Sequence, residues 1–194
     1  LPTFAFIDAP FNLQYYVPNC PETEAAYMGC RARVMGNVYD PGRQQCAGRG
    51  SLSFTSINLP RIAIKAKGDL DVFFDELDNK MNLCIQQLKD RLEIQSQKHV
   101  YNYPFLMGQG VWLDSDKLSW TDEVREVLKH GTLSVGFIGL AETLVALTGQ
   151  HHGESEHSQR LGLEIVARMR ARMDEECQKT GLNFSLLATP AEGL

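Results

Sequence analysis

The chain contains 194 residues, of which 43% are apolar and 22% are charged, and its formal net charge is −5. This composition is typical of a folded globular protein and excludes a disordered chain. An acidic chain has no broad attraction for phosphate backbones, so we expect no polynucleotide partner. No apolar run is long enough to span a membrane and no leader-like segment begins the chain, so we expect no membrane partner and a cytoplasmic location.

Strand-like and helix-like patterns alternate along the chain. Short apolar runs predict buried strands at residues 3–7, 51–57, 133–138 and 183–187. Apolar residues at three- and four-residue steps predict helices at residues 69–97, 121–130, 140–147 and 156–179. This alternation is typical of an α/β protein with a largely buried sheet, arranged as a barrel or as an open sheet.

Individual residues mark where these elements begin and end. Thr121 and Ser155 can cap the helices that follow them, and Gly181 can close the helix before it. Pro60 indicates a strand end or an edge, because proline cannot donate to a sheet ladder.

Both ends of the chain fall at or within predicted secondary-structure elements. Leu1 stands almost directly before a strand-like run, and residues 189–194 resemble the first turn of a helix that is not completed. We therefore expect residues 1–194 to form a single partial domain, cut within the domain at both ends.

A long glycine-rich segment, residues 27–61, contains the most suggestive cysteine. Cys30 follows a glycine and is flanked by Arg31 and Arg33, whose charges favour a thiolate. The pattern alone leaves open whether Cys30 is a nucleophile, a ligand, a radical carrier or a bystander. Cys46 lies in a similar setting, from which we expect similar exposure.

The remaining cysteines indicate no metal site or disulfide framework. Cys20 lies in loop sequence, whereas Cys84 and Cys177 fall in helical patterns and are interpreted as small buried residues. There is no CxxC motif, and five cysteines in an apparently cytosolic chain argue against paired disulfides.

Two further motifs each have a plain interpretation and a functional one. Residues 151–154, HHGE, lack the spacing that puts two ligands on one helical face, so we expect a polar turn and no metal there. Residues 189–192, TPAE, have the form of a helix capping box. Such a helix start can hold a phosphate, or it can serve as a cap alone.

Several segments together closely resemble the class III, anaerobic ribonucleoside-triphosphate reductases. They are PTFAFIDAPFNLQYY, YMGCRARV, GRGSLSFTSINLPRIAI, PFLMGQGVW, HGTLSVGFIGLAETLVALTGQHHGES and LNFSLLATPAEGL, in that order along essentially the whole chain. The resemblance implies part of a ten-stranded α/β barrel of the glycyl radical enzyme and ribonucleotide reductase type. It places the catalytic finger loop at about residues 27–50.

The resemblance also implies a function and its residues. The family reduces ribonucleoside triphosphates to 2′-deoxyribonucleoside triphosphates under anaerobic conditions through a thiyl radical. Cys30 matches the finger-loop cysteine that carries this radical, and Asn58 matches the asparagine near the ribose. The substrate phosphates would meet Thr189, Pro190, Ala191, Glu192 and Gly193.

Other parts of the machinery are expected outside this chain. The resemblance implies a glycyl radical and a structural zinc site nearer the C-terminus of a longer protein, and formate or a dithiol protein as reductant. It also implies ATP and deoxynucleotide effectors, a radical-SAM iron–sulfur activating protein, and a homodimer with the helix at 69–97 near its contact. We expect the fragment alone to be inactive. An alternative function is a nucleotide-responsive dimerisation or binding module without its own chemistry.

Overall fold

The computed structural model describes residues 10, 13–14, 16–24, 27–28, 32–33 and 36–189. The chain divides into two compact units, which are described separately. The first, unit 1, comprises Leu1–Leu52, Glu93–Thr132 and Gly181–Asn183. The second, unit 2, comprises Ser53–Leu92, Leu133–Thr180 and Phe184–Leu194. That residues 1–194 belong to one larger domain stays a prediction.

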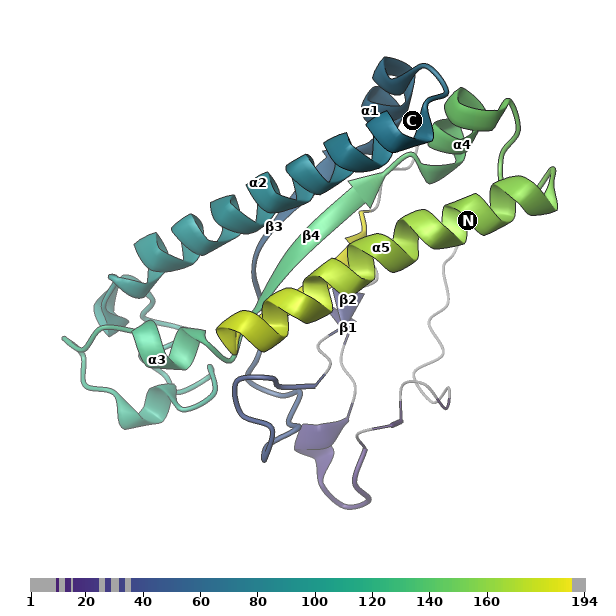
Figure 1. The fold of residues 1–194 in the computed structure, drawn as a ribbon. Helices are drawn as coiled ribbons and strands as arrows, with labels where there is room; N and C mark the ends of the chain where they lie inside the picture. Colours follow the sequence, from purple (N-terminus) through teal and green to yellow (C-terminus); the bar gives the residue numbers. More distant parts are fainter. Residues whose placement is uncertain are drawn as a thin grey trace. The chain divides into compact units, whose positions relative to one another are not determined.

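Three strands form a parallel sheet, as the alternating pattern predicts. The strands β3 (Ser51–Asn58), β4 (Thr132–Ile138) and β5 (Asn183–Ala188) lie side by side in sequence order (Figure 1). The amide of Thr132 donates to the carbonyl of Gly50 at 2.9 Å, so β3 and β4 begin at the same edge. The amide of Thr189 donates to Phe137 at 3.0 Å, so β4 and β5 end together.

Two long helices, which lie in unit 2 apart from the last turn of the first, return the chain from one strand to the next, as parallel strands require. They are α2 (Leu70–Ser96) and α5 (Glu156–Thr180), and both run along the sheet in Figure 1. Their three- and four-residue apolar spacing produces one buried face on each helix. The buried apolar side chains are Phe73, Leu77, Met81, Ile85, Leu88, Leu161, Ile165, Met169, Met173 and Cys177. Each large apolar side chain buried in this way contributes about 1.5–3 kcal/mol.

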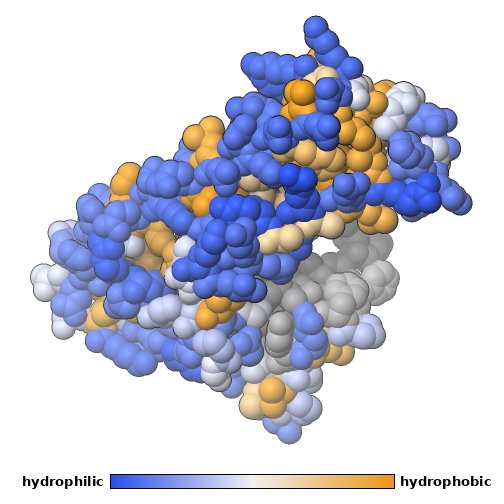
Figure 2. Space-filling view, in the orientation of Figure 1, coloured by the Kyte–Doolittle hydropathy of each residue, from blue (hydrophilic) through white to orange (hydrophobic). Residues whose placement is uncertain are grey.

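A short helix that the sequence analysis did not predict follows β3. This helix, α1 (Leu59–Ala66), has Pro60 in its first turn, where a missing amide hydrogen costs nothing. It packs against α4 (Leu140–Thr148). The contact needs a glycine, because a Cβ atom on Gly139 would lie 2.3 Å from the Pro60 ring, and Gly139 has φ +71°. Apolar side chains remain exposed at this end of unit 2, with Ile64 66% and Val145 46% accessible (Figure 2).

The expected helix at residues 121–130 is mostly wrong. Only α3 (Arg125–Leu128) is helical, and its cap residue is Val124 in place of Thr121. The backbone before α3 contacts His99 and does not form a helical turn. The Thr121 carbonyl lies 3.0 Å from His99 Nδ1, and Glu123 forms a β-bridge with His99. Tertiary contacts therefore override the local helical pattern here.

The other expected elements of the described residues are confirmed to within a few positions. Ser155 caps α5, since its Oγ accepts from the Ser158 amide at 3.1 Å. Gly181 ends the same helix with φ +66°. The strand expected at residues 3–7 lies outside the described residues. Among the described residues, no helix combines the length and apolar character that a membrane crossing requires.

Unit 1 contains a small antiparallel hairpin and several short helical turns. In the hairpin, β1 (Tyr27–Met28) pairs with β2 (Ala32–Arg33), with Met28 opposite Ala32. The 3-10 turns are η1 (Pro21–Thr23), η2 (Val100–Asn102) and η3 (Ser115–Lys117). The core of this unit includes buried Trp112, whose indole Nε1 donates to the Val127 carbonyl at 2.7 Å.

Candidate functional site

The carboxyl ends of the parallel strands carry the two predicted site residues that the structure describes. Asn58 is the last residue of β3, and Thr189 directly follows β5. Ligands of parallel α/β sheets bind at this end of the strands, because helix starts and loops converge there. The structure therefore brings both residues to the same edge of the sheet in unit 2.

A hydroxyl pair joins β3 to the end of β5. Ser56 Oγ and Thr189 Oγ1 lie 2.6 Å apart, and either hydroxyl can be the donor. These two side chains reach across the intervening strand β4 at Gly136. A Cβ atom on Gly136 would lie 2.2 Å from Thr189 Oγ1 and 2.6 Å from Ser56 Oγ. Only glycine leaves room for the pair, so Ser56 and Gly136 are candidate site residues that the sequence analysis missed.

Asn58 has a structural task in addition to its predicted one. Its Oδ1 atom accepts from the Arg61 amide at 3.0 Å and so caps α1. The cap uses only the carbonyl oxygen, which leaves the NH₂ group of the same exposed amide able to donate to a ligand. The signal for α1 was in the sequence, because Asn58 followed by Pro60 is a typical helix start.

The strand-end set, defined as Ser56, Asn58, Gly136 and Thr189, is suited to hold a polar ligand and not to transfer protons. Its side chains are hydroxyls and an amide, which donate and accept hydrogen bonds but do not titrate near neutral pH. Among the residues that the structure describes, no cluster of three or more histidine, cysteine or acidic side chains could hold a metal ion. The arrangement can orient hydroxyl or phosphate groups.

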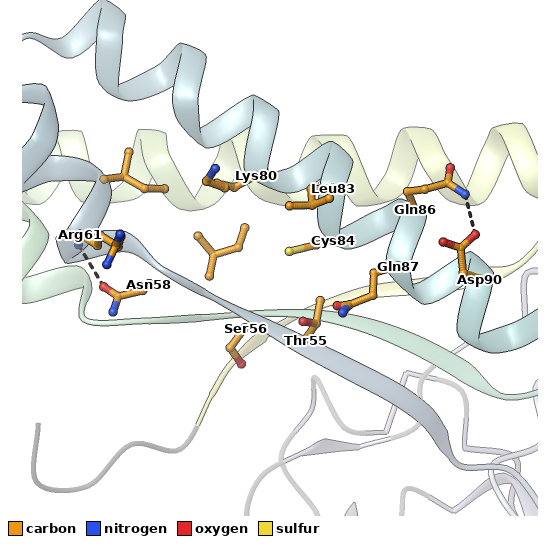
Figure 3. A pocket seen from close by; sticks show the side chains of 12 residues that line it. Thr55, Ser56, Asn58, Arg61, Lys80, Leu83, Cys84, Gln86, Gln87 and Asp90 are labelled. Atoms are coloured by element: carbon orange, nitrogen blue, oxygen red, sulfur yellow. Dashed lines mark hydrogen bonds between the residues drawn. The ribbon is translucent and has the colours of Figure 1, made fainter.

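A pocket of about 500 Å³ lies between β3, α1 and α2 in unit 2 (Figure 3). Its apolar wall includes Ile57, Ile62 and Leu83, and Lys80 and Asp90 also line it. Ser56 and Asn58 contribute atoms to the pocket as well. In Figure 3 the Ser56 side chain points away from α2. The pocket therefore lies on the helix side of β3, and the Ser56–Thr189 pair lies on the other side.

The described cysteines differ in exposure from some of the predictions. Cys46 is buried, with 6% of its surface accessible, so the expectation that it is exposed is wrong. Cys177 is buried as expected, and burial raises the pKa of its thiol. Cys84 is half-buried beside the pocket, and burial raises its pKa too. Burial therefore disfavours a reactive thiolate at Cys84 and Cys177.

The remaining predicted site residues lie outside the described part of the chain. These are Cys30, Pro190, Ala191, Glu192 and Gly193. The polar turn predicted at residues 151–154 is confirmed, because the His151 amide donates to Glu154 Oε2 at 2.8 Å. The Gly153 amide donates to His151 Nδ1 at 3.0 Å in the same turn.

Comparisons with known proteins place the chain in one family. Residues 2–194 match the family described as anaerobic ribonucleoside-triphosphate reductase. The reductase of Salmonella typhimurium is 36% identical over 170 residues, which cover 86% of this chain and 24% of that protein. The reductase of phage T4 is 30% identical over 173 residues, which cover 86% of this chain and 27% of that protein. The chain thus spans about a quarter of the length of these relatives.

Solved structures share the fold. The anaerobic ribonucleotide reductase of Thermotoga maritima with citrate in the active site matches with a TM-score of 0.59 and 19% identity. That match covers 75% of this chain and 25% of the other. The same enzyme in complex with dATP and CTP matches with a TM-score of 0.53 and 16% identity, over 79% of this chain and 23% of the other. The predicted fold class, part of an α/β barrel of the ribonucleotide reductase type, is confirmed. The chain belongs to the anaerobic ribonucleoside-triphosphate reductase family.

Proposed function

We propose that this chain is the central part of the catalytic barrel of an enzyme that reduces ribonucleoside triphosphates to 2′-deoxyribonucleoside triphosphates without oxygen. Membership of the family supports the reaction class. The observation that carries the proposal to this chain is the strand-end set, where Asn58 and Thr189 share one edge of a parallel sheet. The chain spans about a quarter of its relatives, so the activity belongs to a longer protein.

Cys30 is the proposed hydrogen-abstracting residue. Its thiyl sulfur takes the 3′-hydrogen of the ribose and becomes a thiol, which leaves an unpaired electron on the sugar. The 2′-hydroxyl then takes up a proton and leaves as water. Formate or a dithiol protein supplies two electrons, and a second proton completes the new C2′–H bond, before the hydrogen held by Cys30 returns to the 3′ position. A glycyl radical outside these residues supplies the initial unpaired electron. In the sequence, Cys30 lies between the paired strands β1 and β2.

The strand-end residues hold the substrate in this proposal. The Asn58 NH₂ group donates to a ribose hydroxyl while its oxygen caps α1. An amide is too weak a base to take a proton, so its role is orientation. Thr189, fixed by Ser56, begins the segment through Gly193 that receives the phosphates at a helix start.

The wider assembly follows the family. Ribonucleoside triphosphates are the substrates and ATP and deoxynucleotides the effectors, in line with the dATP and CTP complex of the Thermotoga maritima enzyme. The enzyme is a homodimer with α2 near its contact, carries a structural zinc beyond this chain, and depends on a radical-SAM iron–sulfur activating protein. A cytoplasmic location agrees with all of these partners.

Replacing Cys30 tests the proposal directly. In the full-length protein, Cys30→Ser should abolish deoxynucleotide formation, because a hydroxyl holds its hydrogen too tightly to replace the thiol. Glycyl radical formation, measured by electron paramagnetic resonance, should remain intact. Cys20→Ser, in the described loop before η1, serves as the matched control and should keep wild-type turnover. Retained turnover in Cys30→Ser excludes the proposed role, and a wild-type protein that dimerises with deoxynucleotides but never reduces them favours a binding module.

A further inference from the structure

Unit 1 contains a buried polar cluster that the reaction outlined above does not use. Its members are buried Asn37, Arg49, His130 and Asn183, which are 2%, 6%, 3% and 3% accessible, together with Arg43 and Asp114. Buried amides and charged groups are costly unless they are paired, so such a cluster needs a reason. The cluster involves the segment that follows β2, and therefore the chain just after Cys30.

In this cluster, the partners of each side chain determine which of its atoms donates and which accepts. Asp114 accepts from Arg43 Nη1 and Nη2 at 2.9 and 2.6 Å, so its carboxylate is ionised. A carboxylate can only accept, hence His130 Nε2, at 3.1 Å from Asp114 Oδ2, carries a hydrogen and donates. The other ring nitrogen of a neutral histidine is then an acceptor. It receives the Asn37 Nδ2 group at 3.1 Å.

Asn37 also forms a hydrogen bond with Asn183, the first residue of β5. The Asn37 Oδ1 atom accepts from Asn183 Nδ2 at 3.2 Å and from the Asp40 amide at 3.3 Å. The Asn183 Oδ1 atom in turn accepts from the Val38 amide at 2.7 Å. Reversing the Asn37 amide would place two donors against each other at Asn183, so the orientation of Asn37 is fixed by its partners.

Arg49 holds the other end of the segment that begins at Gly36 through three hydrogen bonds. Its Nε donates to the His130 carbonyl at 2.9 Å, and its two terminal nitrogens donate to the carbonyls of Gln45 at 3.0 Å and Gly36 at 3.2 Å. The backbone N–H of Asn37 also donates to Gln44 Oε1 at 2.9 Å. Residues 36–49 are therefore held at both ends against the residues that precede β4.

We propose that Asn37 and His130 are positioning residues, which fix the root of the loop that carries Cys30 and so set the distance over which Cys30 takes hydrogen from the substrate. This inference rests on the proposed function of Cys30. Asn37 follows Cys30 by seven residues, a tether of at most about 25 Å when fully extended. Hydrogen transfer requires near contact, so a displacement of the Cys30 sulfur by about 1 Å is enough to slow it.

Burial of His130 favours the neutral ring that the cluster needs, and the charges around the ring act in both directions. Asp114 faces it directly, Arg43 and Arg49 lie nearby, and the Tyr39 ring packs edge-on at 5.0 Å between centroids. On the far side of this ring, Lys129 and Glu126 pair with each other and both contact Tyr39. Burial lowers the pKa of His130, and Asp114 opposes that effect only in part. A protonated ring would turn a second donor toward the Asn37 NH₂ group and break the hydrogen bond between them.

Two variants of Asn37 in the full-length, activated enzyme test the inference. Asn37→Ser and Asn37→Asp should lower kcat about 10- to 100-fold, with the KM for the nucleotide and the glycyl radical content unchanged. The deuterium isotope effect on kcat with a 3′-deuterated substrate should increase, because hydrogen abstraction becomes slower than the other steps. A purely structural cluster would alter stability without changing this isotope effect.

Asn37→Asp carries a second, pH-dependent signature. A carboxylate opposite His130 Nδ1 raises the pKa of the ring and pairs with its charged form. The ratio of variant to wild-type kcat should therefore rise as the pH falls from about 8 to about 6, whereas that of Asn37→Ser should not. Glu93→Gln, which removes a bidentate ion pair with Arg125 in the same unit, is the control and should match wild type.

The outcomes separate this inference from the proposed function. If wild type turns over and Cys30→Ser does not, but both Asn37 variants keep the wild-type kcat and isotope effect, positioning by Asn37 is wrong. If both variants fail to fold, the cluster is structural and the inference is overturned as well. If Cys30→Ser retains turnover, the proposed function itself fails.

Discussion

The buried cluster of unit 1 and the strand-end set of unit 2 use similar side chains in opposite ways. In the cluster, both ring nitrogens of His130 and both amide atoms of Asn37 are bonded within the protein. In the strand-end set, Asn58 is exposed and uses only its oxygen, which leaves a donor for a ligand. Saturated polar groups fix a backbone, whereas exposed groups with a remaining donor are able to bind.

The two regions also differ in charge. The cluster contains an ionised carboxylate held by arginine, so its integrity depends on protonation states. The strand-end set holds no titratable side chain, so pH should affect it only through its surroundings. This difference makes the two regions separable by experiment, and the predictions below begin with the largest expected effect on stability.

Removing the carboxylate of Asp114 should cause the largest loss. Asp114→Ala leaves Arg43 and His130 without their acceptor, and one-sided removal from such a network costs about 3 kcal/mol of the free energy of unfolding. Denaturant unfolding of the full-length protein measures the change. Asp116→Ala, an exposed carboxylate in the same turn, is the matched control and should change stability by less than about 0.5 kcal/mol.

The free energy of unfolding that Asp114→Ala removes should decrease as the pH falls. Hydrogen bonds from Arg43 hold the pKa of Asp114 well below its usual range, so the folded protein binds fewer protons here than the unfolded chain. The stabilisation is then complete above the unfolded pKa of about 4 and is lost as the pH falls below it. The gap between wild type and Asp114→Ala should therefore narrow in acid. A gap that widened would contradict the assignment.

Filling the space over Gly136 should have the next largest effect. Gly136→Ala places a methyl group within 2.6 Å of both hydroxyls, so Ser56 and Thr189 must separate. Overpacking of this kind costs about 1–3 kcal/mol, and we expect the KM for the nucleotide to rise at least tenfold because Thr189 moves. Gly42→Ala, whose nearest neighbour would be 3.7 Å away, is the control. Unchanged KM in Gly136→Ala would remove the hydroxyl pair from the site.

The fold of unit 2 was largely predictable from the sequence because its signals are local. The apolar repeat of α2 and α5 and the short strands between them identify an α/β protein without any tertiary information. The short helix α1 was missed because Pro60 was interpreted as a strand signal alone, although Asn58 before it is a typical cap. The family resemblance supplied Asn58 and Thr189, and the sequence held no local sign that Ser56 pairs with Thr189.

The buried cluster was not predictable, because it depends on distant residues. Asn37 and Asn183 are 146 positions apart, and no local pattern relates one to the other. The failed helix at 121–130 has the same cause, since His99 pairs with Glu123 and competes with the local pattern. Periodicity reports which face of an element is buried, but it cannot report which polar groups meet inside the fold.

Asn58→Asp should have the smallest effect on stability and still abolish most of the activity. Aspartate is as good a helix cap as asparagine, so α1 should keep its first turn and the free energy of unfolding should change by less than about 0.5 kcal/mol. The substitution replaces the NH₂ donor by a carboxylate oxygen, which repels the substrate hydroxyl or phosphate oxygens. We expect kcat/KM to fall about 10- to 100-fold.

A cap on another helix provides the control for this last variant. Ser155→Ala removes the cap of α5, should cost about 1 kcal/mol, and should leave kcat/KM unchanged because Ser155 is not in the strand-end set. Loss of stability without loss of activity in one variant, and the reverse in the other, would separate capping from binding. If Asn58→Asp were fully active, the amide of Asn58 would serve only α1, and the ribose would have to be oriented by other residues.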